Sequence, residues 1–281
     1  MDIYYLNTAG EKIILSEWPI AVTDLTQLYG RKWKTSIKEN KAKSRASVLY
    51  TYRTTAEFKL DISIYADSKS EYEEVMNNFE AVTDYDVANN TPGKLYVGEY
   101  YLPCFIRDTS PSDYEELFYT VNEKLTVYST NPHWLREAKN SYIAHTEESS
   151  GEEQEYLNFD YNFDYNYAST SGYGALSNET NTGCDFLMTI YGAIENPAIY
   201  INGHLYQVYV TLGTNEYLTI DSRDSTIVLT SATGKTTNVY SLRNQDSYIF
   251  QQIPAGTSTV YWAGTFGFDI TLFEKRSEPL W

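Results

Sequence analysis

Two stretches in the first half of the chain alternate between apolar and polar residues with the period of a β-strand. The first stretch covers residues 57–64, and its apolar positions are Phe58, Leu60, Ile62 and Ile64. The second runs from Leu117 to Val127. Because alternate side chains of a strand point to opposite faces, each stretch predicts a strand with one buried face and one solvated face.

Between these two strands the apolar period changes to that of a helix. Its apolar positions fall on one helical face and are Tyr72, Val75, Met76, Phe79 and Val82. Ser70 followed by Glu73 fits a capping box, so we predict a helix over residues 70–82. A turn at Pro92-Gly93 leads into a further strand over residues 95–106. The order strand, helix, strand, strand predicts a small α+β domain over residues 1–138.

Short strands separated by turn signals dominate the second half. Asn202-Gly203 is a type I′ hairpin signal, and Thr233-Gly234 and Ala255-Gly256 are further turns. Residues 157–167 alternate aromatic or apolar residues with Asn and Asp, which predicts another strand. Tyr206, Val208, Val210 and Leu212 alternate in the same way. With no helical pattern after Ala138, residues 139–281 are predicted to form an all-β domain of two packed sheets.

Composition favours protein interfaces and argues against nucleic-acid binding by the general surface. The 281 residues include 28 Tyr, a residue that suits strand surfaces and protein interfaces because it joins a large ring to a hydroxyl group. The net charge is −17. Since each phosphate contact needs a cation, the general surface of this chain is not expected to bind nucleic acid.

One basic segment stands out against this acidic background. Within fifteen residues it holds seven cations and a single acid, Glu39; the cations are Arg31, Lys32, Lys34, Lys38, Lys41, Lys43 and Arg45. A long polar hairpin or loop is expected here. The segment could grip nucleic acid through Trp33 and Tyr29, could dock on an acidic surface of a neighbouring copy, or could be a solvated loop. The net charge of the chain favours the neighbouring copy.

No arrangement for catalysis or metal binding is found. Cys104 and Cys184 are far apart and are expected to be free and buried. The pattern Asp160-x-Asn162-x-Asp164 opens like a calcium loop, but Tyr165 and Ser171 stand where the loop needs Gly and Glu, so a strand is favoured. The three histidines, His133, His145 and His204, have no partners at ligand spacing. We therefore expect no cofactor and no metal; a pair of carboxylates spaced for glycoside hydrolysis cannot be recognised from sequence.

A family resemblance emerges from motifs taken in order along the second half. They are Leu187-Met-Thr-Ile-Tyr-Gly192, Asn196-Pro197, Ile201-Asn202-Gly203, Tyr217-Leu-Thr-Ile-Asp-Ser222, Ile253-Pro-Ala-Gly256 and Glu274-Lys-Arg-Ser-Glu-Pro279. Their order and spacing resemble the C-terminal half of the distal tail proteins of siphophages. In the first half, Asn131-Pro132-His133-Trp134 is similar to the Asn-Pro-aromatic junction of that family, and Phe159–Tyr165 resembles its aromatic-aspartate strand.

The resemblance implies a ring-forming α+β domain (1–138) followed by a galectin-like β-sandwich (139–281). It implies a non-enzymatic homohexameric ring that joins the tail tube protein to tail-tip proteins and to receptor-binding or baseplate proteins, with a channel for DNA. The basic segment, with Trp33, would clasp the next subunit. The location would be the tip of a virion or prophage-derived tail, made in the host cytoplasm, without membrane insertion or sequence-specific nucleic-acid binding. The alternative is a non-catalytic carbohydrate-binding module that contacts the host cell wall, because exposed Tyr and Trp can stack on sugar rings.

Overall fold

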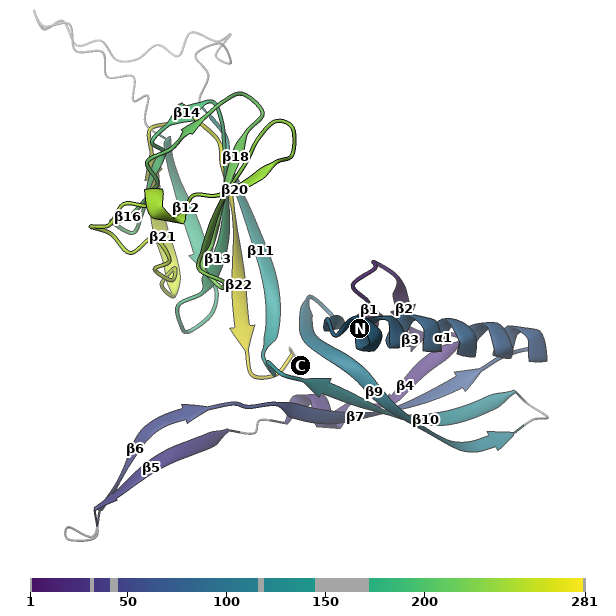
Figure 1. Ribbon diagram of the computed structural model, residues 1–281. Coiled ribbons are helices and arrows are strands. Elements are labelled where there is room, and N and C mark those ends of the chain that lie inside the picture. The colour runs from purple at the N-terminus through teal and green to yellow at the C-terminus, as the bar shows by residue number, and fades with distance from the viewer. Residues whose placement is uncertain (1, 31–32, 41–44, 116–118, 145–171, 280–281) are drawn as a thin grey trace, which may run out of the picture. The chain divides into compact units, whose positions relative to one another are not determined.

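The computed structural model describes residues 2–30, 33–40, 45–115, 119–144 and 172–279, and the chain divides into two compact units (Figure 1). The first unit comprises residues 1–136 and 275–281, and the second comprises residues 137–274. The chain enters the second unit within β11 (Trp134–Tyr142) and leaves it within β22 (Phe268–Arg276). The sequence-based division at residue 138 assigned residues 275–281 to the second domain, whereas their contacts are with the first unit.

An antiparallel sheet in the order β9-β10-β7-β4-β3 is the framework of the first unit. A smaller group, β2-β1-β8, joins it through the pairing of β8 with β9. The bounds are β1 (Ile3–Leu6), β2 (Lys12–Ile14), β3 (Ser16–Glu17), β4 (Ile20–Asp24), β7 (Ala56–Tyr65), β8 (Gly93–Val97), β9 (Tyr100–Glu115) and β10 (Thr120–Ser129). A short 3-10 helix covers Thr26–Tyr29. The strand predicted at 57–64 is therefore confirmed, and the stretch predicted at 95–106 is part of the β8-β9 hairpin.

Helix α1 (Lys69–Asn89) packs on the core of the first unit. Phe79 and Val82 are buried, and the other apolar residues of the predicted helical face pack against the same core. The helix begins two residues earlier than the predicted capping box, because Ser68 is the N-cap: its Oγ accepts a 3.2 Å hydrogen bond from the Glu71 backbone N–H. It ends at Asn89, beyond the predicted end at residue 82, and the following C-cap residue, Asn90, adopts the left-handed conformation with φ of 52°.

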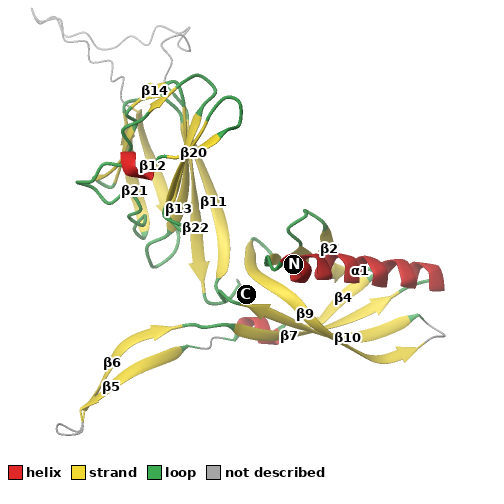
Figure 2. Cartoon of the chain, in the orientation of Figure 1, coloured by secondary structure: helices red, strands yellow, loops and turns green. Residues whose placement is uncertain are grey.

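The second unit is built from two sheets that share one apolar core (Figure 2). One sheet has the order β20-β19-β18-β13-β22-β11, the other β12-β21-β15-β16, and β14 (Ile194–Glu195) pairs with β17 (Thr211–Leu212). The remaining bounds are β12 (Gly172–Asn178), β13 (Asp185–Tyr191), β15 (Ala198–Ile201), β16 (His204–Gln207), β18 (Tyr217–Asp221), β19 (Thr226–Thr230), β20 (Thr236–Asn238) and β21 (Gly256–Trp262). A 3-10 turn covers Tyr240–Leu242. The β-sandwich prediction is confirmed.

The turn predicted at Asn202-Gly203 is observed, whereas one predicted strand is shorter than expected. Asn202 and Gly203 connect β15 to β16 with φ angles of 49° and 81°, as a type I′ turn requires. The stretch predicted as one strand from Tyr206 to Leu212 is interrupted instead: β16 ends at Gln207, and the Val208 N–H bonds to the Pro197 carbonyl. The strand predicted over 157–167 lies outside the described residues.

Candidate functional site

The basic segment identified in the sequence belongs to a separate two-stranded ribbon of the first unit. Strands β5 (Lys34–Asn40) and β6 (Arg45–Tyr52) pair with each other, and in the described part of the chain they form a sheet of their own. Figure 1 shows the ribbon running away from β7. A lone two-stranded hairpin is marginally stable in water. Packing against another protein surface would therefore stabilise this ribbon.

The register of the ribbon places exposed apolar side chains on both of its faces. Tyr52 and Tyr50 of β6 lie opposite Lys34 and Ser36 on one face, and Val48 of β6 lies opposite Ile37 of β5 on the other. The bulge between Ser36 and Ile37, where β6 has one extra residue, moves Val48 to the face opposite that of Tyr50. All four apolar residues are exposed, Val48 with 64% of its surface, and the rings of Tyr50 and Tyr52 lie 5.5 Å apart. We call Ile37, Val48, Tyr50 and Tyr52 the hairpin stripe.

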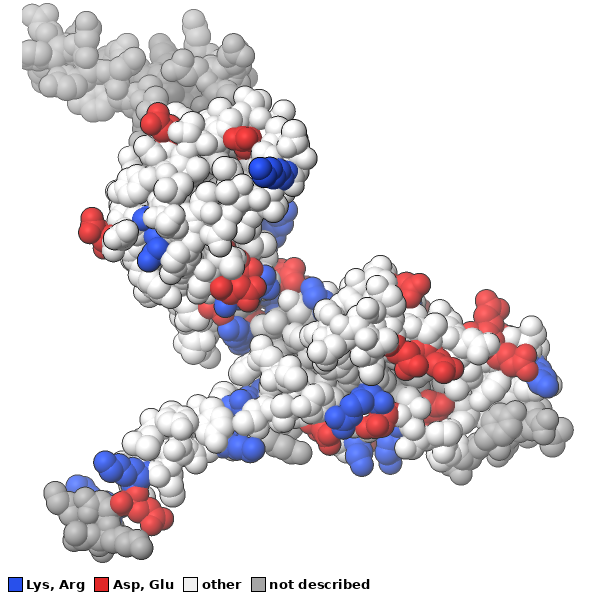
Figure 3. Space-filling view, in the orientation of Figure 1, with Lys and Arg blue, Asp and Glu red and all other residues white. Residues whose placement is uncertain are grey.

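The predicted interface residues are only partly within the described chain. Lys34, Lys38 and Arg45 lie on the ribbon, and Figure 3 shows cations gathered along it; Arg31, Lys32, Lys41 and Lys43 lie outside the described residues. Lys38 pairs with Ser47, the neighbour of Val48, so it lies on the face of Tyr50 and Tyr52, opposite that of Ile37 and Val48. The predicted hairpin exists, and besides its polar residues it carries exposed apolar residues on both faces.

A cluster of rings and cations holds the base of the ribbon. The Trp33 ring lies 5.6 Å from the Arg53 guanidinium carbon and 6.4 Å from the His133 ring, which it meets edge-on. Arg53 donates a 3.1 Å hydrogen bond from Nη1 to the Ser277 carbonyl. Burial, with the nearby charges of Arg53 and Lys275, lowers the pKa of His133. His133 is therefore a neutral packing residue at pH 7, and Trp33 is an anchor of the ribbon as well as a candidate contact.

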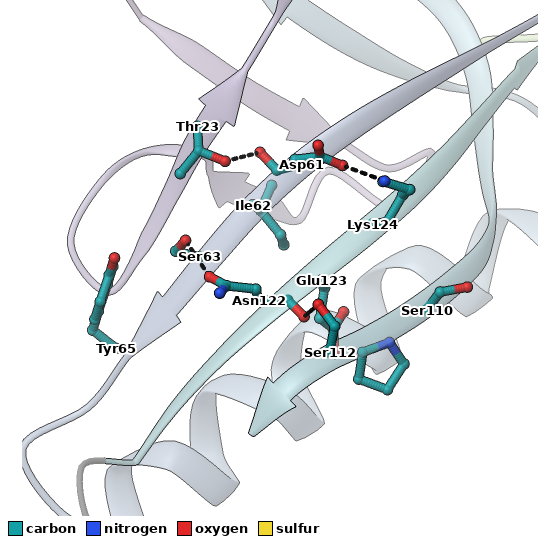
Figure 4. Close-up of a pocket in the computed structure, with 11 residues that line it drawn as sticks. Thr23, Asp61, Ile62, Ser63, Tyr65, Ser110, Ser112, Asn122, Glu123 and Lys124 are labelled. Carbon is teal, nitrogen blue, oxygen red and sulfur yellow. Dashed lines mark hydrogen bonds and ion pairs between the residues drawn. The ribbon is translucent and has the colours of Figure 1, made fainter. Parts of the chain in front are cut away.

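A polar hollow of about 700 Å³ lies on the face of the first sheet opposite the core (Figure 4). Its side chains are largely paired within the sheet. Ser63 Oγ donates to Asn122 Oδ1 at 2.6 Å, and Lys124 Nζ lies 3.5 Å from Asp61 Oδ1. The described lining contains neither His nor Cys, so a hydroxyl activated by an adjacent imidazole is not built here.

The remaining sequence-based candidates behave as structural residues where they are described. Cys104 and Cys184 are buried and form no disulfide in the described chain, as predicted. Burial raises the pKa of the Cys104 thiol well above its usual range. Among the described residues, no group of three or more His, Cys, Asp or Glu side chains could hold a metal ion. His145 and the Asp160–Asp164 pattern lie outside the described residues. No helix in the described ranges is long and apolar enough to cross a membrane.

Comparison with solved structures shows that the fold is that of phage baseplate hub proteins of the distal tail (Dit) type, as the sequence resemblance predicted. The Dit (gp 19.1) protein of SPP1, described as a paradigm of the hub adsorption apparatus in phages that infect Gram-positive hosts, matches with a TM-score of 0.62 and 9% identity over 98% of both chains. Chains of the phage P2 baseplate in its activated conformation match with 12% identity over 99% of both chains, with TM-scores of 0.62 for the Ca form and 0.60 for the Sr form. No family model and no curated protein matches the chain.

Proposed function

We propose that this chain is the structural hub of a long non-contractile phage tail tip. Six copies form a ring that joins the tail tube protein to the tail-tip protein and to receptor-binding or baseplate proteins, and the ring leaves a channel for DNA. The observation that carries this proposal is the match of the whole chain, 98% of each partner, to a protein described as a hub of the adsorption apparatus. The role is non-enzymatic, and the location is the tip of a virion or prophage-derived tail.

The two predicted domains take different parts in this role. Residues 1–138 form the ring, and residues 139–281 form a galectin-like sandwich that is available to other tail-tip proteins. Each unit has a hydrophobic core of its own, which supports this division. A unit with its own core can fold by itself, so contacts with other proteins are needed only for assembly.

The hairpin stripe is the surface we assign to contact between neighbouring copies. Its four residues are exposed and apolar, and they lie on a ribbon that gains little support from the rest of the unit. Contiguous exposed apolar residues mark interaction surfaces. Burying them against the next subunit would stabilise the ribbon and close the contact at the same time.

The cations of the basic segment orient this contact by electrostatic attraction. Lys34, Lys38 and Arg45 are exposed on the ribbon, and the other cations of the segment flank these strands in the sequence. A neighbour of the same net charge, −17, offers acidic surface to them. In this proposal the apolar stripe supplies most of the affinity, and the cations guide and orient the ribbon.

The stripe can be tested by measuring the mass of the purified chain with light scattering. We expect a mass of six copies for the unaltered chain and smaller species for Val48→Asp/Tyr50→Asp, because two buried charges without partners are costly. Thr51→Asp is the matched control, since it places a charge at an exposed polar position of the same strand, opposite Thr35. It should retain the six-copy mass.

Assembly on the tail itself provides the second measurement. Tail particles are assembled either with the unaltered chain or with one of the same variants in its place. The purified particles are then probed with an antibody against this chain. Labelling confined to one end of the tail is expected for the unaltered chain and for Thr51→Asp. A monomer at every concentration combined with unlabelled tails would contradict the hub proposal.

A further inference from the structure

The four-stranded sheet of the second unit carries a row of exposed tyrosines across neighbouring strands. Tyr173 of β12 lies opposite Tyr261 of β21, and Tyr261 lies opposite Tyr200 of β15. Their exposed fractions are 72%, 46% and 41%, respectively. The rings of Tyr200 and Tyr261 are 6.2 Å apart. We call these three residues the tyrosine row.

The sheet that carries the tyrosine row is uncharged. None of its four strands, β12, β15, β16 and β21, contains Asp, Glu, Lys or Arg, although 21% of the chain is charged. Hydroxyl-bearing residues, among them Ser177, Thr257 and Thr259, are exposed on these strands instead. The opposite sheet differs, since β22 alone contains Asp269, Glu274, Lys275 and Arg276.

The tyrosine row rests on a closely packed layer. Trp262, next to Tyr261, is buried and donates a 3.0 Å hydrogen bond from Nε1 to the Phe266 carbonyl. Gly172, next to Tyr173, lies against the Trp262 ring so closely that a Cβ there would collide with it. Tyr142 meets the Trp262 ring edge-on at 5.5 Å and donates a hydrogen bond to the Ala175 carbonyl. The strands that carry the row are therefore firmly held, and little order has to be gained on binding.

We propose that the tyrosine row binds a linear, neutral polysaccharide. One face of a sugar ring carries C–H groups that pack on an aromatic ring, while its hydroxyl groups form hydrogen bonds at the edges. Neighbouring strands are about 4.8 Å apart, which is close to the length of one sugar residue along a glycan chain. Successive tyrosines can thus meet successive sugar rings of a chain that lies across the strands.

Charge selects the class of glycan. A chain of net charge −17 repels anionic polymers, and the four strands offer no Lys or Arg to offset that repulsion. A neutral polymer avoids the cost of burying a charge without a partner. The exposed Thr and Ser hydroxyls match a partner whose polar groups are themselves hydroxyls. This binding concerns the second unit alone and does not depend on ring formation.

The test is affinity electrophoresis of the full chain, followed by calorimetric titration. The neutral probes are dextran and the β-1,4-linked hexamers of glucose and of N-acetylglucosamine, together with an array of neutral linear glycans; polygalacturonate is the anionic control. We expect binding to at least one neutral probe and none to polygalacturonate. Tyr173→Ala/Tyr261→Ala should weaken that binding by on the order of tenfold.

Tyr217→Ala is the matched control. Tyr217 has a similar exposed fraction, 38%, and lies opposite the exposed Tyr191, but it belongs to the charged sheet. Its removal should leave glycan binding unchanged. Tyr173→Ala alone, at the most exposed position, serves if the double variant does not fold, with an expected loss of a few-fold.

The proposal would be overturned by no binding to any neutral glycan, by binding to polygalacturonate alone, or by an equal loss in Tyr217→Ala. A double variant that keeps glycan binding but changes the oligomeric mass would show that the face pairs protein copies, and it too would overturn the proposal. The mass is recorded in the same samples, so the hub role and the glycan site succeed or fail separately.

Discussion

Two buried carboxylates of the first unit occupy opposite environments. Asp86 is fully buried and well supplied with donors: the Tyr5 hydroxyl donates to its Oδ2 at 2.6 Å, and the Thr8 N–H and hydroxyl donate to its Oδ1. Glu123 lies on the core-facing side of β10 between Val121 and Leu125, and its buried Oε2 has no hydrogen-bond partner in the described chain. Burial accordingly raises the pKa of Glu123.

Replacing Glu123 should stabilise the protein at neutral pH. Its pKa in the folded state lies above its pKa in the unfolded state, so the folded state favours the protonated carboxyl. The charged form therefore lowers the free energy of unfolding in full at pH values above the folded pKa. This loss decreases as the pH falls and is gone below the unfolded pKa. We expect Glu123→Leu to raise the free energy of unfolding at pH 7 by about 1 kcal/mol, with a smaller gain at low pH. Urea denaturation at several pH values measures it.

The control for this experiment is Asp86→Leu, which removes a buried carboxylate that is fully bonded. This change leaves the Tyr5 and Thr8 donors without their acceptor and should destabilise the protein by several kcal/mol. A loss of stability at pH 7 in Glu123→Leu as well would show that Glu123 is more favourably placed than its contacts indicate.

The start of α1 shows how one contact defines an element. The sequence contains two serines three residues before a glutamate, Ser68 before Glu71 and Ser70 before Glu73, and both fit the capping-box pattern. In the structure, Ser68 has an extended backbone and caps the helix, and Glu71 Oε2 accepts a 2.9 Å hydrogen bond from the Asp67 N–H. Ser70 lies inside the first turn. The spacing alone does not distinguish these two registers.

The two serines form a matched pair for mutation. Ser68→Ala should lower the free energy of unfolding by about 1 kcal/mol, because it leaves the Glu71 N–H without an acceptor. Ser70→Ala should change it by less than about 0.5 kcal/mol, because Ala suits a helix position. Denaturation midpoints give both values. Equal losses in the two variants would mean that the hydrogen bond between Ser68 and the Glu71 N–H contributes no stability of its own.

At the scale of the whole molecule, the distribution of charge separates surfaces with different tasks. A chain of net charge −17 concentrates seven of its 21 cations in residues 31–45, and the ribbon carries those that the structure describes. One sheet of the second unit is uncharged, while the other contains both signs. This distribution agrees with the two contacts proposed above, an acidic protein surface at the ribbon and a neutral polymer at the tyrosine row.

Salt should weaken assembly if the cations of the ribbon contribute to it. Raising the salt concentration from about 0.05 M to about 0.5 M shortens the range of electrostatic attraction several-fold, so the six-copy mass should persist to lower protein concentration in low salt. Lys38→Glu should reduce this salt dependence. Lys235→Glu, an exposed site on the second unit, changes the net charge equally and is the control. An identical salt response in all three chains would assign assembly to the hairpin stripe alone.

Local patterns allowed much of the fold to be predicted. The strand at 57–64, the apolar face of α1, the Asn202-Gly203 turn and the two-sheet second unit depend on periodicity or on backbone preferences of single residues, which are properties of neighbours in the chain. The candidate ribbon was found through its charges, yet its apolar stripe was missed, although the run from Val48 to Tyr52 was visible in the sequence.

The sequence by itself determined the fold class and most of the elements, because the alternation of apolar residues and the chemistry of turns act over a few positions. Only the tertiary structure decided which residues share a surface. The bulge beside Ile37 places Val48 on the ribbon face opposite that of Tyr50, and the pairing of β12, β21 and β15, strands far apart in the chain, aligns Tyr173, Tyr261 and Tyr200. Register between distant strands is fixed by packing of the whole core, so no local pattern contains it.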